Sequence, residues 1–297
     1  MRDQAEKISS VRIKAFMPSD LPTFREFSGN SLSDDQNKFN NVVAPLTWEK
    51  NPAAGTTGAT MVGGVLAAGI IAALTHNESA VRYENEIRSL VPTFYSSLDQ
   101  NIAGDELTRK LQALASEPRD IRVERFDVAT PTKNSGTAIG GKAATLTISL
   151  EQMVPPDFSG LRMKMRAEAR GAEGNLIFSQ SFYYLPSMEL PGQNLTERVA
   201  AWGANNSKLY RDELKRGIDA LFGALNVVFL SYRSLPDEIK LASAKEALSK
   251  VQCYTRDYLV PIPPSAFDDG RLLAENNSGF KIVRLANNEI LVFPNCQ

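Results

Sequence analysis

The sequence predicts an α+β fold in which a mostly antiparallel sheet packs against two long helical segments, at 80–116 and 195–232, with a small C-terminal β-hairpin module. Two observations indicate this class. Segments in which apolar and polar residues alternate, as in half-buried strands, cluster between 121 and 184. Segments with apolar residues three and four positions apart, as in amphipathic helices, flank that block. The chain has 297 residues, 43% of them hydrophobic, which is enough to bury a sizeable core.

Strands are predicted wherever the alternation is regular. The first covers 10–16, where Val11 and Ile13 share one face. Further strands are predicted over 121–128, 144–150, 161–170 and 175–184. Short loops join these strands, and Gly171–Gly174 is typical of a hairpin turn, so we expect antiparallel pairing. The proline-containing stretch 17–52 is expected to form a long irregular connection.

The first helical segment contains two helices. Residues 80–99 place one apolar stripe on a helix, made of Ile87, Leu90, Val91, Phe94 and Leu98. Pro92 lies within this helix and predicts a kink or a break. A second helix at 104–116 presents Leu107, Leu111 and Leu114 on one face.

The second helical segment, 195–232, carries the clearest pattern. Asn194 and Glu197 resemble a capping box at its start. The helix can break in two at Gly203–Ser207. From Leu214 onward its apolar residues form one continuous face. Trp202 is expected in the core, locking two helices together, rather than on the surface.

We predict that the C-terminal region forms a separate module. We divide the chain into a domain over 1–235 and a module over 236–297. A helix is predicted to start at Ser234–Asp237, with Ile239, Leu248 and Val251 facing inward. Residues 280–285 and 289–293 flank an asparagine-rich turn, which predicts a β-hairpin.

Composition argues against several functions. The formal net charge of -1 gives no global field that would attract nucleic acid. His76 is the only histidine, so a multi-histidine metal site is excluded, and its place after an apolar run suggests a helix cap rather than a catalytic base. The glycine-rich stretch 136–141 matches neither a phosphate-binding loop nor a dinucleotide fingerprint. We therefore expect no enzyme activity, no metal and no cofactor.

Two cysteines, Cys253 and Cys296, lie near the C-terminus. They do not form a C-x-x-C motif, so they indicate neither a zinc site nor a thioredoxin-like site. They are either two free thiols or one disulfide in an oxidising compartment, and we favour the disulfide. Closing a loop of that size would stabilise the fold by about 3–4 kcal/mol.

The segment 52–76 is an apolar, glycine-rich insertion without charge between Pro52 and Thr75. A transmembrane helix needs about 20 apolar residues, and the strongly apolar part here, 61–74, is shorter. Three interpretations stay open: a core helix, a membrane-inserting or oligomer-forming element, and a loop that docks on a partner. If 53–75 contacts a membrane or a partner, the residues at the centre of the contact are Val65, Leu66, Ile70, Ile71 and Leu74.

A basic strand face is the second candidate for binding. Arg162, Lys164, Arg166 and Arg170 lie on one face of the strand 161–170, and Glu168 interrupts them. Such a face can bind phosphate or an acidic partner, or it is a solvated face whose charges protect a sheet edge. Aromatic residues are not interleaved there, which argues against single-stranded nucleic acid.

The layout resembles that of bacterial cell-envelope lipoproteins. The segments that carry the resemblance are the strand Val11–Phe16, the amphipathic helix that includes Tyr83–Leu90, and the late helix that includes Ala201–Leu214. The order of strand, helix, strands and helix over about 8–235 is similar to that of the periplasmic domain of the curli-secretion lipoprotein. The lipidated cysteine of that class is absent from this sequence. The resemblance implies a periplasmic or outer-membrane location and oligomerisation.

Together these features predict a non-enzymatic cell-envelope protein that binds other envelope proteins or itself, or assembles at a membrane. No secretory signal is visible at the N-terminus, so a cytoplasmic location stays an alternative. Two further alternatives stay open: an effector that inserts residues 53–75 into a membrane or forms a pore, and an enzyme with an unrecognised carboxylate site.

Overall fold

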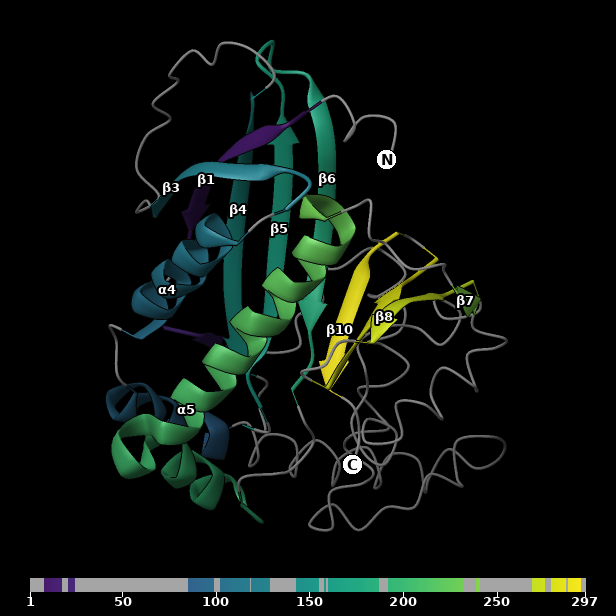
Figure 1. Ribbon diagram of the computed structural model, residues 1–297. Coiled ribbons are helices and arrows are strands. Elements are labelled where there is room, and N and C mark those ends of the chain that lie inside the picture. The colour runs from purple at the N-terminus through teal and green to yellow at the C-terminus, as the bar shows by residue number, and fades with distance from the viewer. Residues whose placement is uncertain are drawn as a thin grey trace, which may run out of the picture.

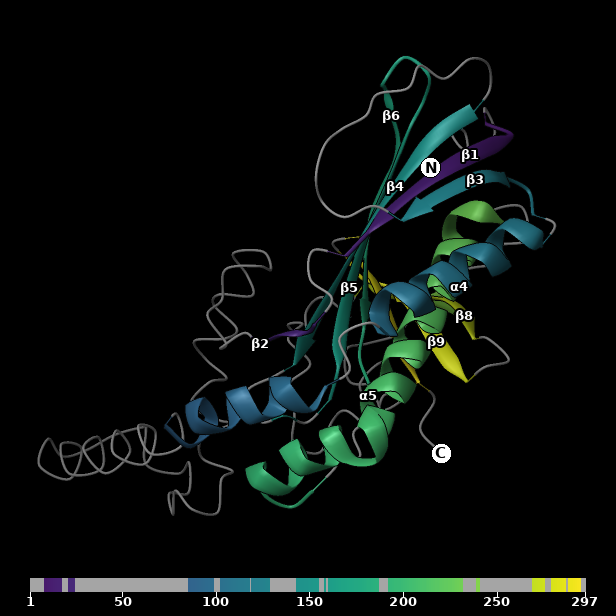
Figure 2. The same ribbon diagram turned by 90° about the vertical axis from the view of Figure 1, so that its left-hand side faces the viewer.

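The computed structural model contains one sheet of ten strands with helices packed on one face (Figures 1 and 2). This architecture confirms the predicted α+β class. The structure describes residues 8–17, 21–24, 85–98, 102–117, 119–128, 143–154, 158, 160–186, 192–231, 239–240, 269–275, 279–286 and 288–294.

The strands include all five that alternation predicts before residue 185. Their bounds are β1 Ser10–Phe16, β2 Thr23–Phe24, β3 Arg122–Val128, β4 Ala143–Val154, β5 Arg162–Arg170, β6 Leu176–Tyr184, β7 Ile239–Lys240, β8 Arg271–Glu275, β9 Phe280–Arg284 and β10 Ile290–Pro294. Across the sheet they follow the order β3-β1-β4-β5-β6-β10-β9-β8-β7, and β2 pairs with one end of β4.

Antiparallel pairs predominate, as predicted. Strands β4, β5 and β6 form an antiparallel meander, and β7 to β10 form a second antiparallel set. Strand β1 lies between β3 and β4 and runs parallel to both. The prediction that 121–128 pairs antiparallel with its neighbours in the chain is therefore wrong. The chain enters β3 from a helix, and such a crossover returns it in the direction of β1.

The C-terminal strands extend the same sheet. The predicted hairpin of 280–285 and 289–293 is present as β9 and β10. Residues 290–292 of β10 pair in parallel with Phe182–Tyr184 of β6. The predicted inward-facing helix position at Ile239 is wrong, because Ile239 lies in β7 and pairs with Leu272. A non-local partner overrides the local pattern there, whereas Leu248 and Val251 lie outside the described residues.

The helices follow the predicted apolar stripes. They are a helix at 85–97, α4 Ile102–Ser116, and α5 Leu195–Leu225, which continues into a π-helical turn at Asn226–Leu230. In α4, Leu107, Leu111 and Leu114 are buried as predicted. The helix at 85–97 continues through Pro92 without the predicted break, and Pro92 is exposed to solvent. Phe94, two residues later, is fully buried.

Helix α5 starts and bends where the sequence predicts. The Oδ1 atom of Asn194 accepts a hydrogen bond from the backbone N–H of Glu197 at 2.9 Å, as in a capping box. Residues 204–207 leave helical geometry, and Asn205, Asn206 and Ser207 have positive φ. The hydroxyl of Ser207 donates to the carbonyl oxygen of Ser97 at 2.7 Å, which ties this bend to the end of the helix at 85–97.

Trp202 lies in the core, as predicted. Its side chain is 1% exposed, and its indole Nε1–H donates to the carbonyl oxygen of Phe158 at 2.9 Å. Its ring meets Phe94 edge to face. The partner for the indole N–H removes the cost of burying that polar group. Trp202 therefore joins α5 to the helix at 85–97.

One face of the sheet forms the core. On β4, β5 and β6 every second side chain is buried beneath the helices, among them Leu146, Met165 and Phe182. Buried residues of β1, β9 and β10 belong to the same apolar cluster. Figure 2 shows α4 and α5 on the same side of β1, β4 and β5. The intervening side chains on these strands point to the opposite face.

Candidate functional site

The face of the sheet that points away from α4 and α5 carries the polar residues of four strands. We call it the outer face. It is formed by Arg12, Lys14, Thr145, Thr147, Ser149, Glu151, Arg162, Lys164, Arg166, Glu168, Arg170, Ser179, Ser181 and Tyr183. Hydroxyl groups and cationic side chains dominate it, so the face can hydrogen-bond and attract anionic groups.

Strand register places two arginines on either side of a hydroxyl. Arg12 of β1 pairs with Thr145 of β4, and Thr145 pairs with Arg170 of β5. The two arginines are separated by two strand spacings, about 9.5 Å. Arg12 also pairs with Arg125 of β3, which continues the row. The side chains of Arg12 and Arg170 are 44% and 54% exposed, so their guanidinium groups are accessible.

The cations of β5 do not protect a sheet edge. Strand β5 lies between β4 and β6 along its whole length, so its backbone groups are already paired. The interpretation of these charges as edge protection is wrong, because that role belongs to a terminal strand. A solvated face and an anion-binding face remain, and the side chain of Arg166 is 63% exposed.

Carboxylates offset part of this charge. Arg166 lies 2.6 Å and Arg170 lies 3.8 Å from the carboxylate of Glu168. Glu124 of β3 accepts a hydrogen bond from the hydroxyl of Ser10 at 2.6 Å and lies 3.5 Å from Arg12. The hydrogen bond from Ser10, followed by the nearby Arg12, lowers the pKa of Glu124. Exposed ion pairs of this kind are weak and can exchange for a ligand's anionic groups.

Lys164 and Tyr183 mark the end of the outer face next to the C-terminal strands. The Nζ atom of Lys164 lies 5.5 Å from the centroid of the Tyr183 ring, within range of a cation–π contact. The hydroxyl of Tyr183 donates to Glu289 at 2.9 Å. Burial, followed by the charge of Glu289, raises the pKa of Tyr183, so its hydroxyl stays protonated. These contacts hold the turn between β9 and β10 against β6.

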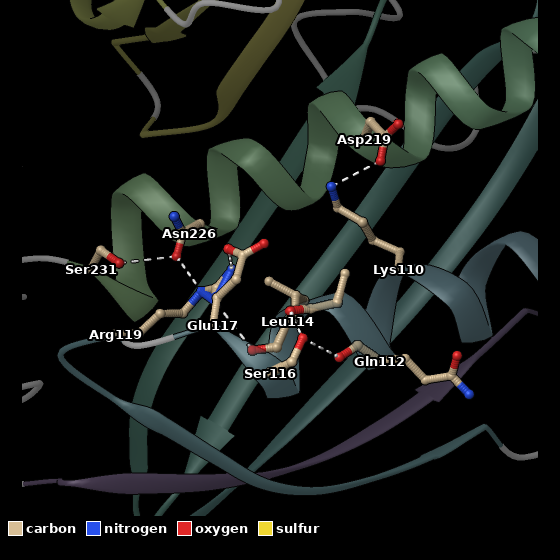
Figure 3. A network of polar contacts seen from close by, with 10 residues as sticks. Lys110, Gln112, Leu114, Ser116, Glu117, Arg119, Asp219, Asn226 and Ser231 are labelled. Carbon is tan, nitrogen blue, oxygen red and sulfur yellow. Dashed lines mark hydrogen bonds and ion pairs between the residues drawn. The ribbon is translucent and has the colours of Figure 1, made fainter.

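A second candidate is a hollow of about 570 Å³ between α4, α5 and β9. It is lined by Lys110, Asp212, Lys215, Arg216, Asp219, Gly223 and Phe280. Lys110 donates to Asp219 at 2.8 Å (Figure 3). Arg109 lies 3.5 Å from the same carboxylate. The lining has three cationic side chains and two carboxylates, and the contact between Lys110 and Asp219 joins α4 to α5.

Arg119 joins the same two helices farther along (Figure 3). Its Nε donates to Oδ1 of Asn226 at 2.7 Å, and its Nη1 donates to the carbonyl oxygen of Leu114 at 3.1 Å. The hydroxyl of Ser231 donates to the same Asn226 oxygen at 3.0 Å. Burial lowers the pKa of Arg119. This network satisfies groups at the ends of α4 and α5, so its role is structural.

Glu213 is a buried carboxyl group beneath α5. It is 7% exposed, accepts a hydrogen bond from the Tyr184 hydroxyl at 3.2 Å and pairs with Arg216. Burial raises the pKa of Glu213, and the charge of Arg216 opposes that shift. Nearby, the hydroxyl of Tyr210 donates to Oε1 of Gln152 at 2.8 Å. These contacts tie α5 to β6 and β4 through the core.

Within the part of the chain that the structure describes, no group of three or more His, Cys, Asp or Glu side chains could hold a metal ion. No helix among those same residues is long and apolar enough to cross a membrane.

The residues that the sequence analysis assigned to contacts lie outside the described residues. This holds for the apolar segment 53–75 with Val65, Leu66, Ile70, Ile71 and Leu74, for Cys253 and Cys296, for His76 and for the glycine-rich stretch 136–141. The basic residues of β5 do share one face as predicted. Arg12, Lys14 and Arg125 also lie on or beside that face, which was not predicted. Their alternation with Val11 and Val123 was a usable signal, but only the pairing of β1 with β3 and β4 brings them together.

Comparisons of this chain with protein-family models, with curated proteins and with solved structures give no match.

Proposed function

We propose that this protein is a non-enzymatic binding protein of the cell envelope, and that it binds an acidic partner protein on the outer face. The main support for this proposal is the row of Arg12, Thr145 and Arg170 on neighbouring strands. In this row two exposed guanidinium groups lie on either side of a hydroxyl group. Arginine suits this role because its planar group can bind a carboxylate with two hydrogen bonds.

The position of the row in the fold supports the proposal. Arg12 and Arg170 lie on strands that are paired on both sides, so their backbones are held in place before a partner binds. On the opposite face of the same strands, buried side chains such as Ile13 and Ala169 pack in the core. This packing holds the strands, and therefore the two arginines, in position. A preorganised face loses little conformational freedom on binding.

The envelope location and a second contact come from the sequence. The resemblance to envelope lipoproteins supports a periplasmic or outer-membrane location. The apolar segment 53–75 supports assembly with itself or with other envelope proteins, through Ile70 and Ile71 among others. Replacing Ile70 and Ile71 with Asp should abolish assembly or membrane contact and leave the fold intact. Unfolding of the double variant would instead identify the segment as ordinary core.

Charge reversal tests the binding face. We expect polyglutamate, a defined acidic probe, to bind the wild-type protein and to bind the double variant Arg12→Glu/Arg170→Glu at least about tenfold more weakly, which corresponds to ~1.4 kcal/mol. The matched control is Lys208→Glu/Lys215→Glu, which makes the same change of charge at exposed positions of α5. Equal weakening in both double variants would show a net-charge effect and contradict the proposal.

A further inference from the structure

The bend in α5 has an unusual backbone. Ala204 leaves helical geometry with ψ 148°. Asn205, Asn206 and Ser207 follow it with φ values of 52°, 55° and 57°. Residues other than glycine adopt this left-handed conformation at a cost in free energy, and they usually do so singly. Three such residues in succession therefore need other contacts to hold them. We call residues 204–207 the bend and residues 195–203 the arm.

Most of the bend is exposed to solvent. The side chains of Asn205 and Asn206 are exposed, whereas Ser207 is 2% exposed. The hydroxyl of Ser207 donates to the carbonyl oxygen of Ser97 at 2.7 Å. The carbonyl oxygen of Asn205 accepts a hydrogen bond from the exposed side of α5, from Arg211 at 3.3 Å. Because Asn205 and Asn206 face solvent, their φ and ψ angles can change without displacing packed side chains.

The arm is docked on an aromatic cluster and on the helix at 85–97. The indole N–H of Trp202 donates to the carbonyl oxygen of Phe158 at 2.9 Å. The centroid of its ring lies 6.1 Å from that of Phe94, and the rings of Phe94 and Phe158 are 5.3 Å apart. Figure 2 shows the arm, at the lower end of α5, beside the helix at 85–97. These contacts hold the arm in place and offset the backbone cost of the bend.

The close contact between the arm and that helix requires a glycine. A Cβ atom on Gly203 would lie 2.5 Å from the Cβ atom of Ser97, closer than side chains approach one another. The rest of α5 is anchored differently, since Leu214, Ile218 and Leu221 are fully buried against the sheet and α4. The arm is therefore the part of α5 that can move while the remainder stays in the core.

We propose that the bend is a hinge, about which the arm moves between its docked position and a position in which α5 is straight. In the straight state residues 204–207 take ordinary helical φ and ψ angles, so their left-handed strain is relieved. The same movement breaks the contacts of Trp202 with Phe158 and Phe94 and uncovers these apolar rings. Gains and losses oppose one another, as in other two-state elements whose hinges are a few residues that absorb a large change of φ and ψ.

Two double variants shift this equilibrium in opposite directions. Asn205→Ala/Asn206→Ala disfavours the left-handed conformation and favours a continuous helix. Asn205→Gly/Asn206→Gly accepts the left-handed conformation and weakens a continuous helix. The measurement is hydrogen exchange at the indole N–H of Trp202, followed by NMR. The chain has two tryptophans, so a Trp48→Phe variant assigns the two indole signals.

The reference for this measurement is the backbone amide of Ile148 in β4. Strand β4 is paired with β1 and β5, so this amide should exchange only when the whole protein unfolds. After correction for intrinsic rates, we expect the Trp202 indole N–H to exchange at least about tenfold faster than the Ile148 amide, because the arm opens locally. The alanine variant should speed exchange at Trp202 by at least about tenfold more, without loss of helical circular dichroism. The glycine variant should slow it.

A second pair of variants acts on the docking contact and leaves the bend unchanged. Gly203→Ala places a Cβ atom against Ser97 and should also speed exchange at Trp202. Gly104→Ala is the matched control, because a Cβ atom at that position of α4 meets nothing within 4 Å. It should leave exchange at Trp202 unchanged. This pair gives the answer if the double alanine variant does not fold.

Two results would overturn the proposal. If Trp202 and Ile148 show equal protection in the wild type and in every variant, the arm opens only when the whole protein unfolds. If the glycine variant speeds exchange at Trp202, or if the alanine variant loses helical signal, the arm unfolds instead of straightening.

Discussion

Arg119 donates from Nε to Oδ1 of Asn226 across 2.7 Å, which links the segment after α4 to the first residue of the π-helical turn after α5. The side chain of Arg119 is 6% exposed, so this contact is shielded from water. Its second donor reaches the carbonyl oxygen of Leu114 in the last turn of α4. One side chain thus satisfies two groups on different helices, and the packing of α4 against α5 depends on it.

Replacing Arg119 with Met should lower the free energy of unfolding by about 2 kcal/mol, because buried hydrogen bonds from a charged donor are lost and their acceptors stay buried. Urea unfolding followed by circular dichroism measures the change. Arg109→Met is the matched control: Arg109 is 45% exposed, and its ion pairs should contribute less than about 1 kcal/mol. Similar losses in the two variants would show that Arg119 does not hold the helices together.

Glu213 should make stability depend on pH in a specific direction. Burial raises its pKa in the folded protein, so the folded state binds a proton more tightly than the unfolded state. Stability from this group is therefore present below the ordinary carboxyl pKa and is lost as pH rises through the raised pKa. Glu213→Gln should remove that loss, so the variant should gain stability relative to wild type as pH rises.

Urea unfolding of both proteins across that pH range gives the comparison. Gln keeps an acceptor for the Tyr184 hydroxyl, so the fold should be retained. If the two stability curves stay parallel at all pH values, Glu213 does not titrate with a raised pKa.

The oxidation state of the two cysteines tests the predicted location in the cell envelope. We expect no free thiol when unreduced, denatured protein from its native host is titrated, because Cys253 and Cys296 are predicted to form a disulfide in an oxidising compartment. The same titration after reduction is the control and should detect both thiols. Two free thiols before reduction would favour a cytoplasmic protein and contradict the envelope location.

Local pattern predicted the elements of this fold, and non-local contacts decided their arrangement. The cap at Asn194, the bend at Gly203–Ser207 and the burial of Trp202 follow from nearby residues, and all are present. The place of β1 between β3 and β4 depends on strands more than 100 residues away in the chain, as the 114-residue separation of Ser10 and Glu124 shows. The alternation of residues 10–16 contains no information on that pairing.

The candidate site shows the same division. Alternation placed Arg166 and Arg170 together, because they share one strand. Arg12 joins them only through the register of β1, β4 and β5, which no segment of the sequence specifies alone. The strand at Ile239 was missed for the same reason, since a two-residue strand exists only because of its partner β8.

NMR mapping of bound polyglutamate tests whether the outer face binds an acidic partner. The backbone amide signals of Arg12, Thr145 and Arg170 should shift on titration, and these shifts should disappear at high salt. The amide signals of Lys208 and Lys215 on α5 should not shift. Shifts confined to the hollow between α4, α5 and β9, or no shifts on β1, β4 and β5, would show that the outer face does not bind acidic partners.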